Sequence, residues 1–420
     1  MKINYCKKCL NPSNHPLGII FNEDGICSGC YVHEEKYEIN WEKKIKKLKK
    51  FFSKYKNKYS YDCIIPINGN GDDYFVTHTA KHILGLRPLL VSYNNHFNTK
   101  VGIRNTANLV NKLDCEHINM TINPKLVREI TKTSLNSIGD IYWHILAGNQ
   151  AFPVQIACKM NIPFILWGVN GWLDQVGKFS HYHEVEMTKK IWEEFSLRNF
   201  TYIDLLKRNK KIKNRDLAPL IYPSLNEIKD KNIRGIYLGN YVLWDAKKQT
   251  EDMIKLYGYE TMEQQRTHNT YESIYCKNNA GVHDYIKYLK HGYGKVTDHL
   301  NRDIRFKRIS REEAIKIRSY YEPKQPEDLN IFLNWINTSK KEFFSIIKKH
   351  SKRNTKSKSK SNSNSNSNKK YKVSKTNIAS LEKKLNYKKT KLLEKETLKD
   401  DYIVFGRSYS DKRNFKALKG

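Results

Sequence analysis

Short apolar runs alternate with helical patterns between residues 61 and 168. The runs DCIIPI, PLLVSY, CEHINMT and IPFILWG have the length of buried strands, and the segments between them carry apolar residues at helical spacing, such as Val76, Ala80 and Ile83. Strands that alternate with helices of this length indicate a parallel sheet with helices on both faces. Such sheets bind ligands at the carboxyl ends of their strands.

The pattern changes on both sides of this region. Residues 231–350 show mainly helical patterns, with one strand near IRGIYLG and capping-box spacing at Ser310 and Ser339. The tract SKSKSNSNSNSNKK is too polar to bury a core and is expected to be disordered, and the later LEKKLNYKKTKLLEKETL is expected to form an exposed helix. The predicted regions are a cysteine-containing, turn-rich region (1–40), a basic helix (41–60), an α/β domain (61–230), a mostly helical region (231–350), a low-complexity linker (351–370) and a basic tail (371–420).

The composition indicates a folded protein and limits the classes of partner that it is expected to bind. The 420 residues are 39% hydrophobic and 12% aromatic, which excludes a small disulfide scaffold. The net charge of +33 suggests nucleic acid, but nearly half of it lies in residues 351–420, and the lysines of the 41–60 helix are better explained as a solvated face than as an RNA or membrane patch. Nucleic acid is therefore not the favoured partner. No apolar run is long enough to span a bilayer and the N-terminus lacks a signal core, so we expect a cytoplasmic protein without a transmembrane segment.

Two cysteine pairs near the N-terminus give the strongest local signal. Cys6 and Cys9 form one CxxC knuckle, Cys27 and Cys30 form the other, and seventeen residues separate them. This spacing is typical of a tetrahedral four-cysteine zinc site, in which a closed ligand shell makes the metal structural. A dithiol redox pair is disfavoured because neither CxxC opens a helix of a βαβ unit.

The stretch CIIPINGNGDDYF has the outline of a phosphate-binding turn. Strand, glycine-rich bend and helix together bring backbone N–H groups toward an anion. The bend lacks the ending of a Walker A loop and the spacing of a dinucleotide fingerprint, and it holds two carboxylates, Asp72 and Asp73. On its own, the turn is equally compatible with an ordinary strand-to-helix connection.

The order of the motifs resembles the N-acetyl sugar amidotransferase family of WbpG/PseA-like proteins. The resemblance covers roughly residues 1–325 and rests on the cysteine pairs, the turn, LGLRPLLVSYNNHFNTKVGIRN, AFPVQIA, YLGNYVLWDA and HDYIKYLKHGYGKVTDHLNRDIRFKRISREEA. It implies a PP-loop ATP pyrophosphatase domain of the adenine nucleotide alpha hydrolase type with an N-terminal zinc ribbon. It further implies ATP, Mg²⁺ and structural Zn²⁺, and an acetamido sugar, nucleotide-linked or acidic, as the substrate.

The implied reaction converts the acetamido group to an acetamidino group, in lipopolysaccharide O-antigen or other surface-glycan synthesis. AMP is transferred to the amide oxygen, and ammonia then expels it; this needs orientation and charge neutralisation but no protein nucleophile. No cysteine has the context of a glutaminase nucleophile, so the resemblance implies a separate glutaminase partner.

The turn departs from the family pattern SGGxDS. The implied phosphate-binding positions are Asn68, Gly69, Asn70 and Gly71, and the implied catalytic positions are Asp72 and Asp73. Asp73 stands in place of the final serine and adds a negative charge where pyrophosphate would lie. Unless a metal bridges it, ATP affinity should fall by about one to three decades. Alternatively, Asp73 caps the following helix.

Other segments offer candidates for the sugar site. The resemblance favours Lys290, Lys295, Asp298 and Arg302 as substrate-binding residues over a merely solvated charged helix. The segments WHILAG and WGVNGWLDQ lie near predicted strand ends and either line a sugar site or belong to the core. In HYHEVE, His181 and His183 would share one face of a strand and could bind a metal, although a surface loop is favoured.

Three functions remain open at this point. The leading hypothesis is the sugar amidotransferase. The second is a catalytically impaired homologue that keeps sugar or partner binding as a scaffold. The third is a zinc-ribbon ATP pyrophosphatase that modifies RNA, which the positive charge would favour and a steep salt dependence of binding would reveal.

Overall fold

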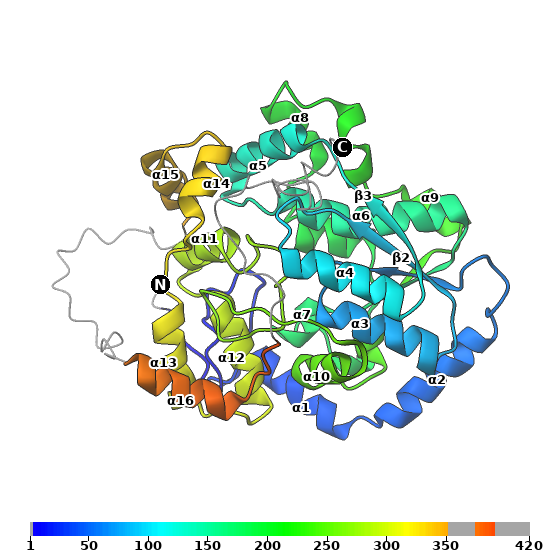
Figure 1. The fold of residues 1–420 in the computed structure, drawn as a ribbon, viewed down its shortest axis with the longest axis horizontal. Coiled ribbons are helices and arrows are strands. Elements are labelled where there is room, and N and C mark those ends of the chain that lie inside the picture. The colour runs from blue at the N-terminus through cyan, green and yellow to red at the C-terminus, as the bar shows by residue number, and fades with distance from the viewer. Residues whose placement is uncertain (1–2, 352–373, 391–420) are drawn as a thin grey trace, which may run out of the picture.

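A five-stranded parallel sheet forms the centre of the molecule (Figure 1). The computed structural model describes residues 3–351 and 374–390. The strands are β1 (Cys63–Pro66), β2 (Pro88–Tyr93), β3 (Glu116–Met120), β4 (Phe164–Trp167) and β5 (Arg234–Tyr237). They lie in the order β3-β2-β1-β4-β5, and every neighbouring pair is parallel.

Alternating side chains of each strand enter two different cores. Ile64 of β1 packs with Leu89 and Val91 of β2 on one face, whereas Cys63 and Ile65 pack on the other. Both faces are apolar because helices cover both, as parallel sheets require. The predicted α/β fold with helices on both faces is confirmed.

The helices divide between the two faces of the sheet. Helix α6 (Trp143–Met160) packs against β1, β2 and β4. On the other face, α3 (Gly71–His78) follows β1 directly and packs against α10 (Ala246–Tyr257). The remaining helices of the first 260 residues are α1 (Ser28–Glu38), α2 (Trp41–Ser53), α4 (Lys100–Lys112), α5 (Pro124–Ile138), α7 (Gly171–Asp174), α8 (Tyr202–Arg208) and α9 (Leu225–Asp230), with short π or 3₁₀ turns at Thr79–Ile83, His181–His183, Ile191–Ser196, Asn214–Leu220 and Leu238–Asn240.

The sheet extends beyond residue 230, where the sequence placed the end of the α/β domain. β5 pairs with β4 along its whole length, from Phe164 opposite Arg234 to Trp167 opposite Tyr237. The strand expected near IRGIYLG therefore completes the sheet and does not belong to the helical region that follows it.

The C-terminal region is mostly helical, as predicted. It contains α11 (Val282–His291), α12 (Lys295–Arg305), α13 (Arg311–Tyr321), α14 (Leu329–Trp335), α15 (Lys340–His350) and α16 (Lys375–Leu385). Apolar side chains of α12, α13 and α16 form one core with the four N-terminal cysteines. The first thirty residues thus pack against a segment almost 300 residues away, and the blue N-terminal segment lies beside α12 in Figure 1.

Of the exposed helix predicted over LEKKLNYKKTKLLEKETL, the structure shows the helix over residues 381–385, but not the exposure. The helix is α16, which ends at Leu385, and Asn386 follows in a left-handed conformation. Ile378 and Leu385 are only 2% exposed because they pack into the core with α13. The low-complexity tract, which the sequence predicts to be disordered, lies within residues 352–373, and these are outside the described residues. The basic tail from Lys391 onward is outside them as well.

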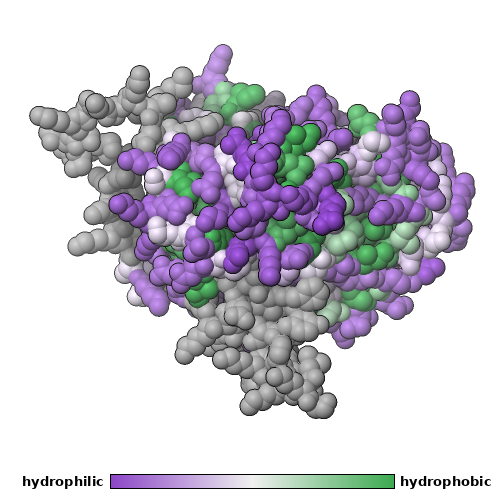
Figure 2. Space-filling view, turned by 90° about the horizontal axis from the view of Figure 1, so that it is seen from above, coloured by the Kyte–Doolittle hydropathy of each residue, from purple (hydrophilic) through white to green (hydrophobic). Residues whose placement is uncertain are grey.

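Hydrophilic side chains cover most of the face shown in Figure 2, with small separate hydrophobic patches between them. Within the part of the chain that the structure describes, no helix combines the length and apolarity of a membrane span.

Candidate functional site

The strand order reverses between β1 and β4, and the larger of the two cavities that adjoin the glycine-rich turn opens there. Loops that leave the carboxyl ends of neighbouring parallel strands on opposite sides of a sheet form a crevice, which is the usual ligand site of this architecture. The cavity has a volume of about 550 Å³. The glycine-rich turn after β1 contributes Asn68, Asn70, Asp72 and Asp73 to its wall, and the segment after β4 contributes Trp172.

The glycine-rich turn forms a preformed anion nest. Three consecutive backbone N–H groups, of Asn68, Gly69 and Asn70, point to one position at the N-terminus of α3. Gly69 is required there, because its φ is +89° and an added Cβ would lie 2.7 Å from the carbonyl oxygen of Gly102. Converging N–H groups at a helix N-terminus bind anionic oxygens.

The side chain of Asp73 occupies this nest. Its Oδ2 accepts the three N–H groups at 2.6 Å from Asn68, 2.7 Å from Gly69 and 2.9 Å from Asn70. Burial raises the pKa of Asp73 to about 6, although the three hydrogen bonds oppose the rise. Of the two roles considered for this residue, the geometry shows the cap: the carboxylate lies where the turn would hold a phosphate oxygen.

Asp72 lies beside the nest, in surroundings that disfavour the ionised form of its carboxyl group. Burial raises the pKa of Asp72 to about 8, Glu272 and Asp73 add to the rise, and Arg302 opposes it. Its buried Oδ1 has no hydrogen-bond partner. Mg²⁺ bound mainly through phosphate oxygens needs only one or two protein carboxylates. The unpaired oxygen of Asp72 therefore fits such an ion.

A second cavity of about 470 Å³ adjoins the turn on the side of β2 and β3. Asn68 lines both cavities. Amide side chains dominate the polar part of this second wall, which contains Asn68, Asn94, Asn95, Asn98, Asn111 and Asn119. Amides carry both donors and acceptors, which suits the edge of a heterocyclic base.

Lys290 is the one predicted substrate-binding residue among those that line the large cavity. Its Nζ donates to the carbonyl oxygens of Ile138 at 3.1 Å and Gly139 at 3.0 Å, the last residues of α5 and its cap. This contact fixes α11 against the end of α5.

The other three predicted substrate-binding residues have internal partners. Lys295 Nζ donates to Ser273 Oγ at 2.9 Å and to Asn279 Oδ1 at 2.6 Å. Asp298 pairs with Lys287, and Arg302 pairs with Glu272 at 2.6 Å. The structure does not bring these side chains together with Lys290 on one surface. They connect α12 to α11 and to the segment 272–279 instead.

The tryptophan segments separate into cavity and core residues. Trp167 and Trp172 of the second segment line the large cavity. Trp143 of the first segment is 2% exposed and donates its indole N–H to the carbonyl oxygen of Phe200, so it belongs to the core. His181 and His183 do not form a strand; they lie in a 3₁₀ turn in which His181 is buried.

Two cavity residues escaped the sequence reasoning. Asp140, in the connection between α5 and α6, lies 3.4 Å from the Nδ1 of His283, and both line the cavity. Arg198 also lines it, with a left-handed backbone at φ 54°. His283 lay within a segment already singled out, but Asp140 and Arg198 carry no local motif. Only the fold brings them to the cavity.

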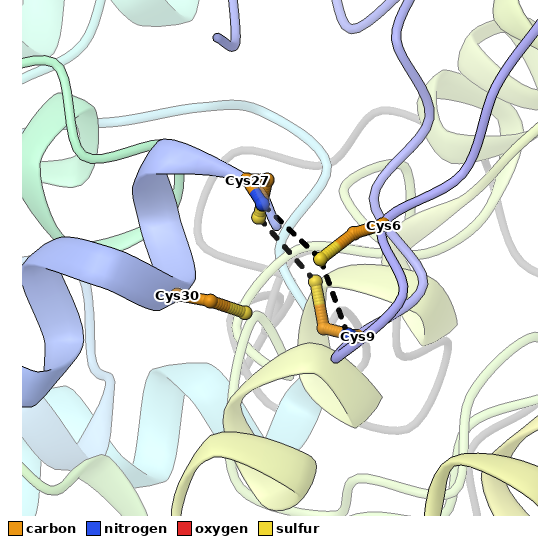
Figure 3. A group of neighbouring side chains, drawn as sticks. All are labelled: Cys6, Cys9, Cys27 and Cys30. Carbon is orange, nitrogen blue, oxygen red and sulfur yellow. Dashed lines mark hydrogen bonds between the residues drawn. The ribbon is translucent and has the colours of Figure 1, made fainter. Parts of the chain in front are cut away.

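The four predicted cysteine ligands converge in the interior (Figure 3). All four Sγ atoms lie within 4.8 Å of one another, and those of Cys9 and Cys27 are 3.6 Å apart. A tetrahedron with Zn–S bonds of about 2.3 Å places its sulfurs about 3.8 Å apart, so the cluster fits a structural zinc ion. Across residues 3–351 and 374–390, this is the one group of three or more potential ligands close enough to hold a metal. Backbone N–H groups of Cys9 and Cys27 donate to the sulfur of Cys6, as expected for a thiolate.

Arg305 connects the cysteine cluster to the cavity wall. Its guanidinium lies 3.9 Å from the sulfur of Cys27 and donates to the carbonyl oxygens of Asp174 and Gln175. Burial would lower the pKa of Arg305, but the thiolates of the cluster outweigh it and raise the pKa above its ordinary value. Because Gln175 lines the large cavity, the cluster supports one wall of the site.

Comparison with known families identifies the C-terminal part of the chain. Residues 260–378 match the family described as LPS biosynthesis protein WbpG-like, C-terminal domain. No curated protein matches the chain. The chain therefore contains a WbpG-like C-terminal domain, joined to a four-cysteine cluster and a parallel five-strand sheet that are consistent with the WbpG/PseA-like family of LPS biosynthesis proteins.

Proposed function

We propose that this protein is an ATP-dependent amidotransferase that converts the acetamido group of a sugar to an acetamidino group during surface-polysaccharide or glycan synthesis. The observation that carries the proposal is the anion nest of Asn68, Gly69 and Asn70, which opens into a cavity large enough for a sugar at the switch point of the sheet. The WbpG-like domain supports a sugar substrate.

The two cavities suit the two halves of the reaction. The asparagine-lined cavity fits the base of ATP, and the nest between the cavities fits its phosphates. Asp72 would hold Mg²⁺, which would supply positive charge to the departing pyrophosphate. The large cavity, which adjoins the nest, would hold the sugar next to the ATP.

The wall of the large cavity suits an acidic or nucleotide-linked sugar. Arg198, Lys287 and Lys290 give it three cationic side chains, and Trp167 and Trp172 add aromatic surface. Arg198 forms no ion pair within residues 3–351 and 374–390, so its planar guanidinium is available to a carboxylate or phosphate.

Ammonia comes from a separate glutaminase in this proposal. A glutaminase thiol must be activated by a lowered pKa or an adjacent base. Burial instead raises the pKa of every cysteine outside the zinc cluster, namely Cys63, Cys115, Cys158 and Cys276. These cysteines have the properties of core residues and not of a nucleophile.

Asp73 must leave the nest before phosphate can enter it. Its carboxylate holds all three N–H donors, so ATP competes with an internal anion. The same contact favours a second candidate, a homologue that has lost ATP turnover and keeps sugar binding as a scaffold.

One assay separates the two candidates. The full-length protein is incubated with ATP, Mg²⁺, ammonium and nucleotide-linked acetamido sugars, and AMP is quantified. The amidotransferase produces AMP only when sugar and ammonium are both present. The scaffold binds sugar in calorimetry without producing AMP, and Asp73→Ser then restores AMP formation. A matched control is Asp204→Ser, because Asp204 makes the same kind of cap on the surface helix α8, where its Oδ2 accepts the N–H of Thr201 at 2.8 Å.

AMP formation that no acetamido sugar stimulates, in either the wild type or Asp73→Ser, contradicts the proposed function.

A further inference from the structure

Asp140 and His283 form a carboxylate–imidazole pair in the wall of the large cavity. Asp140 Oδ1 lies 3.4 Å from His283 Nδ1. The carboxylate is held in place because the same oxygen accepts the backbone N–H of Tyr142 at 2.7 Å. The imidazole packs on the ring of Tyr142, with 4.5 Å between ring centroids.

This arrangement leaves one imidazole nitrogen for a bound molecule. Nδ1 faces Asp140 and is buried, whereas the His283 side chain as a whole is 23% exposed and lines the cavity. His283 Nδ1 makes no hydrogen bond in the structure, and the carboxylate 3.4 Å away favours the tautomer that carries its proton there, which leaves Nε2 as the proton acceptor. Among the described residues, no hydrogen bond involves this Nε2.

The surrounding charges keep Asp140 ionised. Burial would raise the pKa of Asp140, but His283, Arg198 and Lys290 outweigh it and hold the pKa below its usual range. Besides His283, the titratable groups that line this cavity are Lys287, Lys290 and His291 from α11, and His15, Asp72, Asp73, Asp140, Tyr142, Arg198, Tyr237, Tyr275 and Tyr293 from other elements. An ionised Asp140 in turn stabilises the imidazolium after proton transfer.

We propose that His283 is the general base of the ammonia step and that Asp140 is its positioning residue. This proposal rests on the proposed function. Ammonia attacks the carbon of the O-adenylyl imidate and forms a C–N bond, giving a tetrahedral adduct with a positively charged nitrogen. Nε2 of His283 removes one proton from that nitrogen, the C–O bond to AMP breaks, and the amidine and AMP leave. The sum is amide, ATP and ammonia giving amidine, AMP and pyrophosphate.

The test separates the ammonia step from the activation step. His283→Gln keeps the size and polarity of the side chain but cannot take a proton at neutral pH. With saturating sugar and no ammonium, exchange of labelled pyrophosphate into ATP should remain within about twofold of the wild type. With ammonium, kcat should fall by about 10²–10⁴-fold, the usual contribution of a general base.

The pH profile gives a readout that a structural role would not change. At a fixed concentration of free ammonia, the wild-type rate should fall toward acid pH, because a protonated imidazole cannot accept a proton from the adduct. His283→Gln should lose this acid limb, and Asp140→Asn should shift it to lower pH, because the imidazolium loses its carboxylate. His82→Gln, at an exposed histidine outside the cavity, should match the wild type.

Each possible result either supports or overturns the proposal that His283 is the general base. An unchanged rate and acid limb in His283→Gln overturns the proposal, and so does an equal loss of pyrophosphate exchange and ammonia-dependent turnover, which would indicate a structural role. A wild-type protein that turns over no sugar overturns both this proposal and the proposed function, whereas wild-type turnover with an unaffected variant overturns this proposal alone.

Discussion

Asp73 occupies the position in the turn where a phosphate oxygen would bind. Its carboxylate satisfies three N–H groups that would otherwise bind a phosphate oxygen, and burial raises its pKa to about 6. The sequence predicted both a cap and a conflict with phosphate at this position. It could not decide between them, because the direction of a side chain depends on the φ and ψ angles of the turn.

The first prediction concerns the neighbouring Asp72 and protein stability. The pKa of Asp72 in the folded protein, about 8, lies above the ordinary value of 3.8. The folded state therefore holds a proton that the unfolded state releases, and this side chain reduces stability as pH rises from about 4 to about 8. Asp72→Asn should raise the free energy of unfolding by about 1–3 kcal/mol at pH 8, the cost of an unsatisfied buried group, with little change at pH 4.

Denaturant unfolding at both pH values measures the effect of Asp72→Asn. Glu42→Gln is the matched control, because the Glu42 side chain is 76% exposed. A variant that is less stable than the wild type at pH 8 would show that Asp72 has a partner that outweighs its burial.

The second prediction concerns Arg198 and substrate choice. A guanidinium that holds a carboxylate contributes about 1.5–3 kcal/mol, equivalent to about 10–150-fold in binding. Arg198→Met should raise KM by this factor for sugars that carry a carboxylate and should change KM for neutral sugars by less than about threefold. Arg215→Met is the control, since the Arg215 side chain is 89% exposed. Equal KM changes for both sugar classes would contradict a role in carboxylate recognition.

At the scale of elements, the cysteine cluster packs into the rest of the fold and supports the cavity wall, and it does not form a separate domain. Its four cysteines share a core with α12, α13 and α16, and Arg305 of α12 links it to the segment that follows α7. Ser28 Oγ donates to the carbonyl oxygen of Val176 in the same segment at 2.6 Å. Metal loss should therefore loosen a wall of the sugar site as well as the N-terminus.

The third prediction tests this mechanical link. Cys30→Ser should bind less than one zinc ion per chain, should lower the unfolding temperature, and should increase solvent quenching of the fluorescence of Trp172, which lines the cavity beside this segment. Cys115→Ser, at a cysteine outside the cluster, should leave the metal content unchanged. Full zinc content in Cys30→Ser would contradict the four-cysteine site.

The fourth prediction concerns the segment that follows α16. The ring of Tyr387 packs on His268 and Tyr271, and its hydroxyl donates to the carboxylate of Asp303. Tyr387→Ala should reduce the free energy of unfolding by about 2–3 kcal/mol, less than the roughly 3–5 kcal/mol for a fully buried ring, because Tyr387 is partly buried. Thermal unfolding measures the loss. Tyr182→Ala is the control at an exposed tyrosine, and equal stability of the two variants would show that the segment does not contribute to the fold.

The elements could be predicted better than their contacts. The strands and the zinc cysteines follow from local patterns, because strand periodicity and CxxC spacing are properties of short segments. The partners of Lys295, Asp298 and Arg302 could not be predicted, since Ser273, Lys287 and Glu272 reach them only after α11 and α12 pack together. The burial of Ile378 likewise depends on α13, which lies some sixty residues earlier in the chain.

At the scale of the whole molecule, distant segments meet around one cavity. The N-terminal loop with His15, the turn after β1, the segment after β4 and helix α11 all contribute to its wall. The sheet topology explains this convergence, because the order β3-β2-β1-β4-β5 places the ends of β1 and β4 side by side at the switch point. The WbpG-like domain contains α11, and residues of α11 form part of the cavity wall at the switch point of the sheet.

The most direct test of the proposed function follows nitrogen into the sugar. The full-length protein is given ATP, Mg²⁺, ¹⁵N-ammonium and a nucleotide-linked acetamido sugar, and the products are analysed by mass spectrometry. We predict one ¹⁵N atom in each product sugar, in place of one oxygen, with one AMP formed per sugar converted. Formation of AMP with the sugar unchanged, or no AMP from any acetamido sugar in either the wild type or Asp73→Ser, would contradict the amidotransferase function.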